Sequence, residues 1–386
     1  LAFEHRMYLP LAAVCTFAVI SAVELWRVLQ SFGKVPCRAL TTAALATLFT
    51  SVTALGSLTY LRNQDYRSAI SIWTDVVEKA PHHARGYNNL GTELLKAGRI
   101  DDAIPYFQRV IDMEPQHVDA RSNLGMALTQ KGQIDAAIDY LQSAIEIDPE
   151  FAMAHDYLGI ARTRNHQIEE AIQSFRTAIV LNPYLASPHL NLGVIRARQG
   201  QLDQALDHFD MAVRLDPHDA TAHYNYGSVL HQRGQLDDAM RHYELALQLT
   251  PTYANAHFKL GLVLIAKNHF DQAALHFEQA VRINPKHRQA RAHLVSWHLQ
   301  QARTSAGQQQ WERALQNYRR MIQLMPEMAE AHHALGEVLL VRGQLNAAIK
   351  HFREAVRLKP GFEPAKQNLQ RLSSGESERF KEEPTQ

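Results

Sequence analysis

Histidine is the residue type in this chain best suited to chemistry, because an imidazole binds metals and titrates near neutral pH. The sequence holds 21 histidines. Five of them recur at one place in a repeating pattern: His155, His189, His223, His257 and His332. Zinc needs ligands about 2 Å from the ion, whereas neighbouring helix pairs stand on the order of 10 Å apart. One histidine per repeat therefore cannot chelate an ion. We expect half-buried packing residues and predict no metal site.

A second polar set, mostly asparagine, occupies the sixth place of successive repeats. Its members are Asn89, Asn123, Asn191 and Asn225, with Tyr157 and Lys259 at the same place in two other repeats. An amide side chain offers one acceptor and two donors, so it can pair with both sides of a peptide group. On a concave surface, such a row would hold an extended peptide by its backbone with little sequence preference. The alternative is that asparagine is simply a common, solvated residue at this place.

Apolar side chains stand one residue before this asparagine row. Leu190, Tyr224 and Phe258 follow one another in three successive repeats. They could form an apolar strip for the side chains of a partner, where buried aromatic anchors carry much of the binding energy. The alternative is that they pack between adjacent repeats.

Motifs for catalysis are not found. The sequence has no phosphate-binding glycine loop, no nucleophile elbow and no zinc-protease motif. Its 40 Lys and Arg nearly balance its 39 Asp and Glu, for a formal net charge of +1, so no basic footprint for nucleic acid is present. We predict that this chain is not an enzyme, has no catalytic residues and no cofactor, and binds no nucleic acid.

The polar rows recur because most of the sequence repeats every 34 residues, which is typical of helical-repeat proteins. Prolines mark the period and glycines keep the same phase. The prolines are Pro81, Pro115, Pro149, Pro183, Pro217, Pro251 and Pro285, followed by Pro326 and Pro360, and the glycines are Gly91, Gly125, Gly159, Gly193, Gly227, Gly261 and Gly336. Alanines in the second half of each unit follow the same register. The period therefore predicts one structural unit repeated along most of the chain.

Each repeat predicts two helices joined by a tight turn. In the first, Tyr87, Leu90 and Leu94 recur at helical spacing, so they form one buried stripe. Gly91 leaves room for the second helix to come close. Gly98 follows the first helix, where a helix commonly ends in a left-handed residue; Gly132, Gly200, Gly234, Gly343 and Asn268 take the same place.

This 34-residue helix–turn–helix pattern resembles the tetratricopeptide repeat (TPR) over residues 63–372. The resemblance implies an all-α TPR α-solenoid, a right-handed superhelix whose first helices line the concave surface. We expect a partial repeat in 63–83, eight repeats and a capping helix in 84–372, and a disordered tail in 373–386. The repeats are 84–117, 118–151, 152–185, 186–219, 220–253, 254–287, 288–328 and 329–362. The asparagine row resembles that of the superhelical TPR domain in O-linked N-acetylglucosamine transferase.

The repeat 288–328 is longer than the others by seven residues. Trp311, Ala314 and Tyr318 keep the register of the second helix, so the insertion precedes Trp311. We expect a lengthened first helix and a polar turn at Gly307.

Residues 1–62 predict a membrane region with two transmembrane helices, at about 8–26 and 39–61. The second stretch, residues 39–61, is 23 residues without a charge, and about 20 are needed to cross a bilayer. Arg27, Lys34 and Arg38 lie between the spans, and the positive-inside rule then places this loop in the cytoplasm and the repeats on the other side, in periplasm or lumen. The alternative is a signal peptide followed by a soluble helical cap.

Residues 4–83 resemble the last membrane spans of proteins that fuse a glycosyltransferase-C-like membrane domain to TPRs, such as the TPR-containing O-mannosyltransferases. The resemblance is carried by Glu4-His5-Arg6-Met7-Tyr8-Leu9-Pro10 before the first span and by Arg62-Asn63-Gln64-Asp65-Tyr66 after the second. The catalytic acids of that family lie in an early luminal loop that this chain does not contain. Since the chain begins with Leu1, a fragment of a longer gene product fits this resemblance.

The sequence thus predicts an integral, multi-pass membrane protein whose TPR groove binds a protein or an extended peptide. The alternative function is the acceptor-presenting part of a membrane glycosyltransferase whose catalytic domain is absent here. A component of an envelope assembly or secretion complex is a third reading.

Overall fold

The computed structural model describes residues 68–374 and six isolated helical residues before them, Glu24, Arg27, Val28, Ala46, Thr50 and Thr53. Apart from Glu24, Ala46, Thr50 and Thr53, the predicted spans 8–26 and 39–61 fall outside the described residues, as does the predicted tail after Ser374. Among the residues that are described, no helix is both long and apolar enough to cross a bilayer. The membrane region therefore stays a prediction of the sequence.

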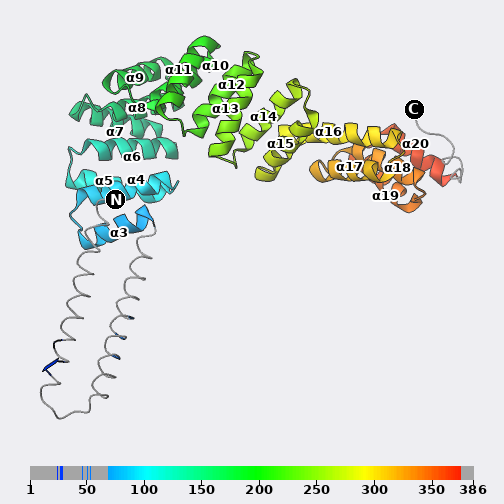
Figure 1. Ribbon diagram of the computed structural model, residues 1–386, viewed down its shortest axis with the longest axis horizontal. Helices are drawn as coiled ribbons and strands as arrows, with labels where there is room; N and C mark the ends of the chain where they lie inside the picture. The colour runs from blue at the N-terminus through cyan, green and yellow to red at the C-terminus, as the bar shows by residue number, and fades with distance from the viewer. Residues whose placement is uncertain are drawn as a thin grey trace. The chain divides into compact units, whose positions relative to one another are not determined.

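All regular secondary structure in the described part is helical, and the chain forms two compact units, residues 1–165 and 166–386. Unit 1 holds α3 (Ala69–Lys79), α4 (Ala84–Lys96), α5 (Ile100–Met113), α6 (Val118–Lys131), α7 (Ile134–Ile147) and α8 (Ala152–Arg164). These helices pack in chain order, and α6 also lies against both α4 and α8 (Figure 1). The first helices of successive repeats are therefore neighbours in unit 1.

Unit 2 repeats the same arrangement over more helices (Figure 1). They are α9 (Ile168–Leu181), α10 (Ala186–Arg198), α11 (Leu202–Leu215), α12 (Ala220–Gln232), α13 (Leu236–Leu249), α14 (Ala254–Ala266), α15 (Phe270–Ile283), α16 (Arg288–Gly307), α17 (Trp311–Leu324), α18 (Ala329–Val341), α19 (Leu345–Leu358) and α20 (Glu363–Ser373). Each helix packs on the next, and α12 also touches α10 and α14. The predicted all-α helical-repeat solenoid is what the structure shows.

In six repeats the glycine of the first helix sits beneath a large side chain of the second helix. A Cβ added to Gly261 would stand 2.6 Å from Phe277, and Phe277 is almost fully buried. Gly336 has the same relation to Phe352 at 2.6 Å. Because these distances are far below ordinary contact, only glycine lets the two helices approach this closely. The prediction that Gly91 and its equivalents make room for the second helix is confirmed.

The turn inside each repeat uses one left-handed residue, two places before the second helix. The predicted glycines have φ of 71–87°, and Asn268 has φ 63°, so this prediction is confirmed. The predicted turn at Gly307 is wrong, because Gly307 is the last residue of α16 and Gln309 is left-handed instead (φ 59°). The backbone N–H groups of Gln309 and Gln310 cap the helix by donating to the carbonyls of Ala306 and Ser305. Gln309 lies two residues before the start of α17, as the left-handed residue of the other repeats does before its second helix.

Candidate functional site

The two asparagines of the row in unit 1 differ: Asn123 is bound within the protein, whereas Asn89 makes no hydrogen bond with the described residues. Asn89 and Asn123 are half-buried on α4 and α6. The amide nitrogen of Asn123 donates to Asn88 Oδ1 at 3.1 Å and to Thr92 Oγ1 at 3.4 Å. These bonds join the first helices of adjacent repeats, so the donors of Asn123 serve the solenoid itself.

The members of the row in unit 2 differ from one another. The amide of Asn191 donates to the carbonyl and to the hydroxyl of Ser187, at 3.0 and 3.3 Å. In the capping helix, Asn368 contacts His333 Nε2 at 3.1 Å. The half-buried Asn225 makes no hydrogen bond with the part of the chain that the structure describes. Of these three side chains, only that of Asn225 keeps both its donors and its acceptor for a ligand.

Asn225 lines a hollow of about 560 Å³ in unit 2, formed by the first helices α10, α12 and α14 with one residue of α11. Its walls are Val194, Ala197, Arg198, Phe209, Asn225, Ser228, Val229, His231, Gln232 and Lys259. No acidic side chain lies among them. Neither Arg198 nor Lys259 forms an ion pair with any described residue. The hollow is therefore a mixed polar and apolar surface with positive charge.

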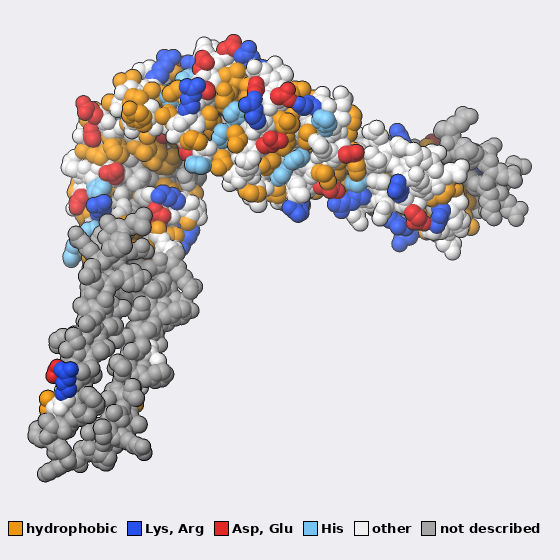
Figure 2. Space-filling model, viewed as in Figure 1, with side chains coloured by type: hydrophobic (Ala, Val, Ile, Leu, Met, Phe, Trp, Pro, Cys, Tyr) orange, Lys and Arg blue, Asp and Glu red, His pale blue; other side chains and the backbone are white. Residues whose placement is uncertain are grey.

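The charge of this hollow comes from its two permanent cations. Burial, and after it the positive charge of Lys259, lowers the pKa of His231 below its ordinary value. His231 is therefore neutral at pH 7, where Arg198 and Lys259 are charged. Elsewhere on the visible face, acidic and basic side chains are interspersed, and histidines stand among apolar side chains over unit 2 (Figure 2).

The predicted apolar strip packs inside unit 2. Phe258 is only 6% exposed, and its ring lies against Phe277 and His287, at centroid distances of 5.8 and 4.8 Å. The ring of Tyr224 lies against that of Tyr253 in a tilted arrangement, with the centroids 4.9 Å apart. Leu190 packs on the core cluster of Phe209 and Val229. These contacts are those of the packing alternative that the sequence leaves open.

A second hollow, of about 720 Å³, follows the turns between repeats of unit 1. It is lined by residues 114–119 with Asp148 and Phe151, and none of the candidate binding residues from the sequence lies in it. We therefore place the candidate site at Asn225 in unit 2.

Comparison with known families identifies the repeat. The family model of the C-terminal domain of cilia and flagella-associated protein 70, a tetratricopeptide-repeat domain, matches residues 38–295, more than half of the chain. A general tetratricopeptide-repeat model matches residues 298–361. The chain belongs to the tetratricopeptide-repeat family. Neither match is to a membrane glycosyltransferase, so the resemblance of residues 4–83 to glycosyltransferase-C proteins is not shown.

Three solved structures are among those similar to this chain. PilF of Pseudomonas aeruginosa has 19% identity and a TM-score of 0.49, over 56% of this chain and 97% of its own. TTC0263 of Thermus thermophilus has 22% identity and a TM-score of 0.43, over 47% and 100%. YrrB, described as a TPR protein with an unusual peptide-binding site, has 23% identity and a TM-score of 0.39, over 48% and 95%. No match is found among curated proteins.

The recurring histidines of this TPR protein are paired, which the sequence reasoning missed. In four repeats a second histidine, 19 residues later on the second helix, faces the first through its Nδ1 atom. The Nδ1–Nδ1 distances are 3.3 Å for His189–His208, 3.0 Å for His223–His242, 3.0 Å for His257–His276 and 3.1 Å for His332–His351. The second histidines themselves repeat every 34 residues from His208 to His276, and this signal could have revealed the pairs. Within residues 68–374, no group of three or more His, Cys, Asp or Glu is placed to hold a metal ion.

Proposed function

We propose that this chain is a protein-interaction scaffold that holds an extended peptide in the hollow of unit 2. The observation that carries the proposal is the state of Asn225, which lines the hollow without a partner of its own. A half-buried amide of this kind can donate to and accept from one peptide group of a ligand. The TPR fold supports the scaffold role, since the first helices of its repeats form a continuous surface.

The charges of the hollow favour a ligand with an acidic group. Arg198 and Lys259 flank Asn225 from the neighbouring helices α10 and α14, with no carboxylate partner in the described chain. A Glu or Asp side chain of the bound peptide would accept hydrogen bonds from these two cations, and such charge-assisted hydrogen bonds are among the stronger ones. The apolar wall of Val194, Ala197 and Val229 would take a small side chain next to it.

The test uses labelled heptapeptides of alternating residues, Glu-Ala, Lys-Ala and Gln-Ala, with binding followed by fluorescence anisotropy. We expect the full chain to bind the Glu-Ala peptide best. Asn225→Ala should weaken that binding about two- to tenfold, because a neutral hydrogen bond contributes roughly 0.5–1.5 kcal/mol. Arg198→Gln should weaken it about tenfold or more, because a hydrogen bond to a charged group contributes roughly 1.5–3 kcal/mol. Asn123→Ala in unit 1 is the matched control and should leave the affinity unchanged. Equal binding of all three peptides, or no effect of Asn225→Ala, would reject the proposed site.

A membrane tether in residues 1–62 completes the proposal, and it rests on two mainly apolar stretches of sequence, of which 39–61 carries no charge. Extraction of native membranes at alkaline pH tests it. A tethered chain stays in the pellet, and release into the supernatant would remove this part of the proposal. The comparisons do not favour the glycosyltransferase alternative.

A further inference from the structure

The first histidine of each pair has one ring nitrogen already engaged. In three repeats its Nε2 lies at hydrogen-bond distance from the carbonyl of the proline that ends the preceding repeat. The pairs of atoms are His223 Nε2 and Pro217 O at 3.1 Å, His257 Nε2 and Pro251 O at 3.2 Å, and His332 Nε2 and Pro326 O at 3.1 Å. A carbonyl only accepts, so Nε2 carries the proton and donates it. Nδ1 of the first histidine is then bare in the neutral ring.

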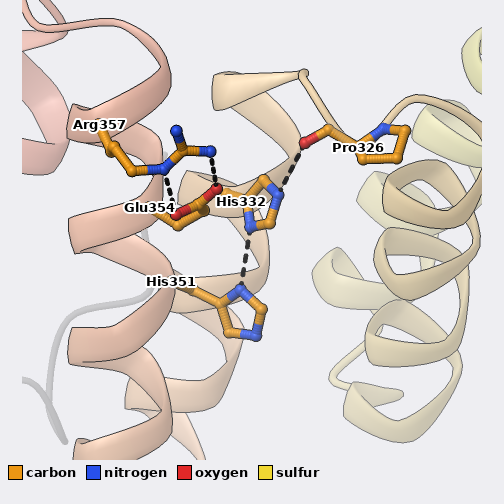
Figure 3. A network of polar contacts seen from close by, with 5 residues as sticks. All are labelled: Pro326, His332, His351, Glu354 and Arg357. Carbon is orange, nitrogen blue, oxygen red and sulfur yellow. Dashed lines mark hydrogen bonds and ion pairs between the residues drawn. The ribbon is translucent and has the colours of Figure 1, made fainter.

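The second histidine must therefore supply the proton between the rings. His351 Nδ1 lies 3.1 Å from the bare Nδ1 of His332, and His332 stands between His351 and Pro326 (Figure 3). The bond requires His351 to donate from Nδ1. The first histidine thus connects its own repeat to the turn before it and to the second helix after it.

Counting protons shows how acid acts on such a pair. The second imidazole can take a proton on its other nitrogen and still donate from Nδ1. If the first imidazole is protonated instead, the second must switch to the tautomer with a bare Nδ1 and accept, and protonation of both rings would place two N–H groups face to face at about 3 Å. A closed pair therefore accepts one added proton, whereas two separated imidazoles accept two once the pH is below about 6.5.

We propose that the four histidine pairs are an acid-sensitive latch that holds the helices of unit 2 together at neutral pH and opens as the pH falls. The latch joins α10 to α11, α12 to α13, α14 to α15 and α18 to α19. Because α12 also carries Asn225, opening of the His223–His242 pair acts on the helix at the centre of the hollow. This inference does not depend on what the hollow binds.

The titration of the pairs agrees with this geometry. Burial lowers the pKa of His189, His208, His257, His276 and His351. Burial, with His223 as the next cause, lowers the pKa of His242 to about 4. A folded pKa below the ordinary value means that the unfolded chain binds more protons below about pH 6.5. The stability from the closed pairs is therefore complete above that pH and is lost as the pH falls toward the folded values.

Charged groups of both signs face the pairs from the packed helices. His208 faces Arg196 of α10, Arg176 of α9 and its neighbour Asp207. His242 faces Asp210 of α11 together with Asp238 and Arg241 of its own helix. His257 faces Arg282 of α15, and His351 faces Arg319 of α17 together with Lys350 and Glu354. The acids oppose the shift, but Glu354 is itself bound by Arg357 at 2.6 and 2.8 Å (Figure 3). The direction of each shift remains downward.

The repeat formed by α16 and α17 has a histidine–asparagine contact in place of a histidine pair. Burial lowers the pKa of His298 there too, and its Nε2 is buried without a hydrogen-bond partner among the described residues. There His298 Nδ1 lies 2.8 Å from Asn317 Oδ1, and the amide nitrogen of Asn317 donates to the Arg313 carbonyl at 2.9 Å. The amide orientation makes His298 the donor, so protonation of its other nitrogen leaves this bond intact. Asparagine also suits the other pairs, because its amide can donate to a neutral histidine and accept from a protonated one.

The test replaces the four second histidines by asparagine, as His208→Asn, His242→Asn, His276→Asn and His351→Asn in one chain. Urea unfolding of the full chain between pH 7.5 and 5.0 gives the protons taken up on unfolding from the pH dependence of stability. We expect the variant to take up about four protons fewer than the wild type at pH 5.5, roughly one per pair. The matched control replaces the exposed histidines His82, His166, His218 and His269 by asparagine and should change this uptake much less. If the fourfold pair variant took up as many protons on unfolding as the wild type, or if the control variant lost as many as the pair variant, the proposed latch would be wrong.

A second measurement serves if the fourfold variant does not fold. Nitrogen NMR of the wild-type chain with labelled histidine reports the protonation of each ring nitrogen. We expect the ring nitrogens of His242 and His257 that are bare in the closed pairs to stay unprotonated at pH 5.5, because burial lowers the pKa of both residues. Protonation of these nitrogens with midpoints near pH 6.5, while the fold is intact, overturns the proposal.

Discussion

Substitution of Gly261 by alanine tests whether the glycine of a first helix sets the distance between the two helices of a repeat. The new Cβ would stand 2.6 Å from Phe277 Cε1 and 2.9 Å from two further ring atoms, whereas carbon atoms in contact prefer about 3.5–4.0 Å. The ring is 1% exposed, so it cannot move without displacing the core. Overpacking of this kind costs about 1–3 kcal/mol, and alanine regains at most about 1 kcal/mol of helix propensity. We expect a net loss of roughly 1–2 kcal/mol in the free energy of unfolding.

Two other glycines give the graded controls for this prediction. At Gly227 the nearest atoms to an added Cβ are 3.1 Å away, so Gly227→Ala should cost less than Gly261→Ala. Gly307 is helical with no atom within 4 Å, so Gly307→Ala should stabilise the chain by up to about 1 kcal/mol. Urea unfolding followed by circular dichroism measures all three. If Gly261→Ala were as stable as the wild type, or if Gly227→Ala cost more, the argument from close approach would be refuted.

Three further predictions concern the turns, the hollow and the histidines. Gly343→Val, at a left-handed position with φ 71°, should lower the unfolding free energy by roughly 1–2 kcal/mol. Gly307→Val, at a right-handed position, should cost less than half of that. Equal costs of the two substitutions in urea unfolding would contradict the role of the turn. In the hollow, Lys259→Gln should weaken binding of the Glu-Ala heptapeptide. It should also reduce the salt dependence of that binding, because a charged pair is screened by salt. An unchanged salt dependence in anisotropy titrations would contradict the proposed role of charge. His242→Asn alone should reduce the loss of unfolding free energy between pH 6.5 and 4, by about 1–2 kcal/mol after allowance for the partial exposure of the ring. If this variant showed the same pH dependence of stability as the wild type, the prediction would be wrong.

Much of the fold was predictable because the repeat imposes its own register. Gly98 and Asn268 were assigned to left-handed turns, and both are left-handed. Gly91 was assigned to a close approach, and an added Cβ there would stand 2.7 Å from Phe107. In the long repeat the same reasoning chose Gly307, because glycine is the usual residue for such a turn. The left-handed residue is instead Gln309, which keeps the usual distance of two residues before the second helix at Trp311.

The candidate site was less predictable, because equal places in the repeat do not give equal surroundings. Asn123 and Asn225 share the sixth place, yet Asn123 is bound by Asn88 and Thr92 whereas Asn225 makes no such bond. These differences depend on residues of the neighbouring repeat that vary along the chain. The histidine pairs were missed for another reason, because the argument counted one histidine per repeat and left out the second helix.

The long helix α16 has a consequence for how a change spreads along unit 2. In a repeat protein each unit senses only its neighbours, so loosening propagates stepwise. Where other repeats carry a pairing histidine, this one carries Arg291, which donates to the Leu324 carbonyl at 3.3 Å, and its histidine contact lies two turns later at His298. In the described part of α16 and α17 a histidine–asparagine contact replaces the pair of facing imidazoles, so these helices form a boundary between two blocks that carry such pairs, α10–α15 and α18–α19. In mild acid, amide hydrogen exchange should quicken in two separate islands with a protected segment between them, so that the chain melts as two cooperative blocks.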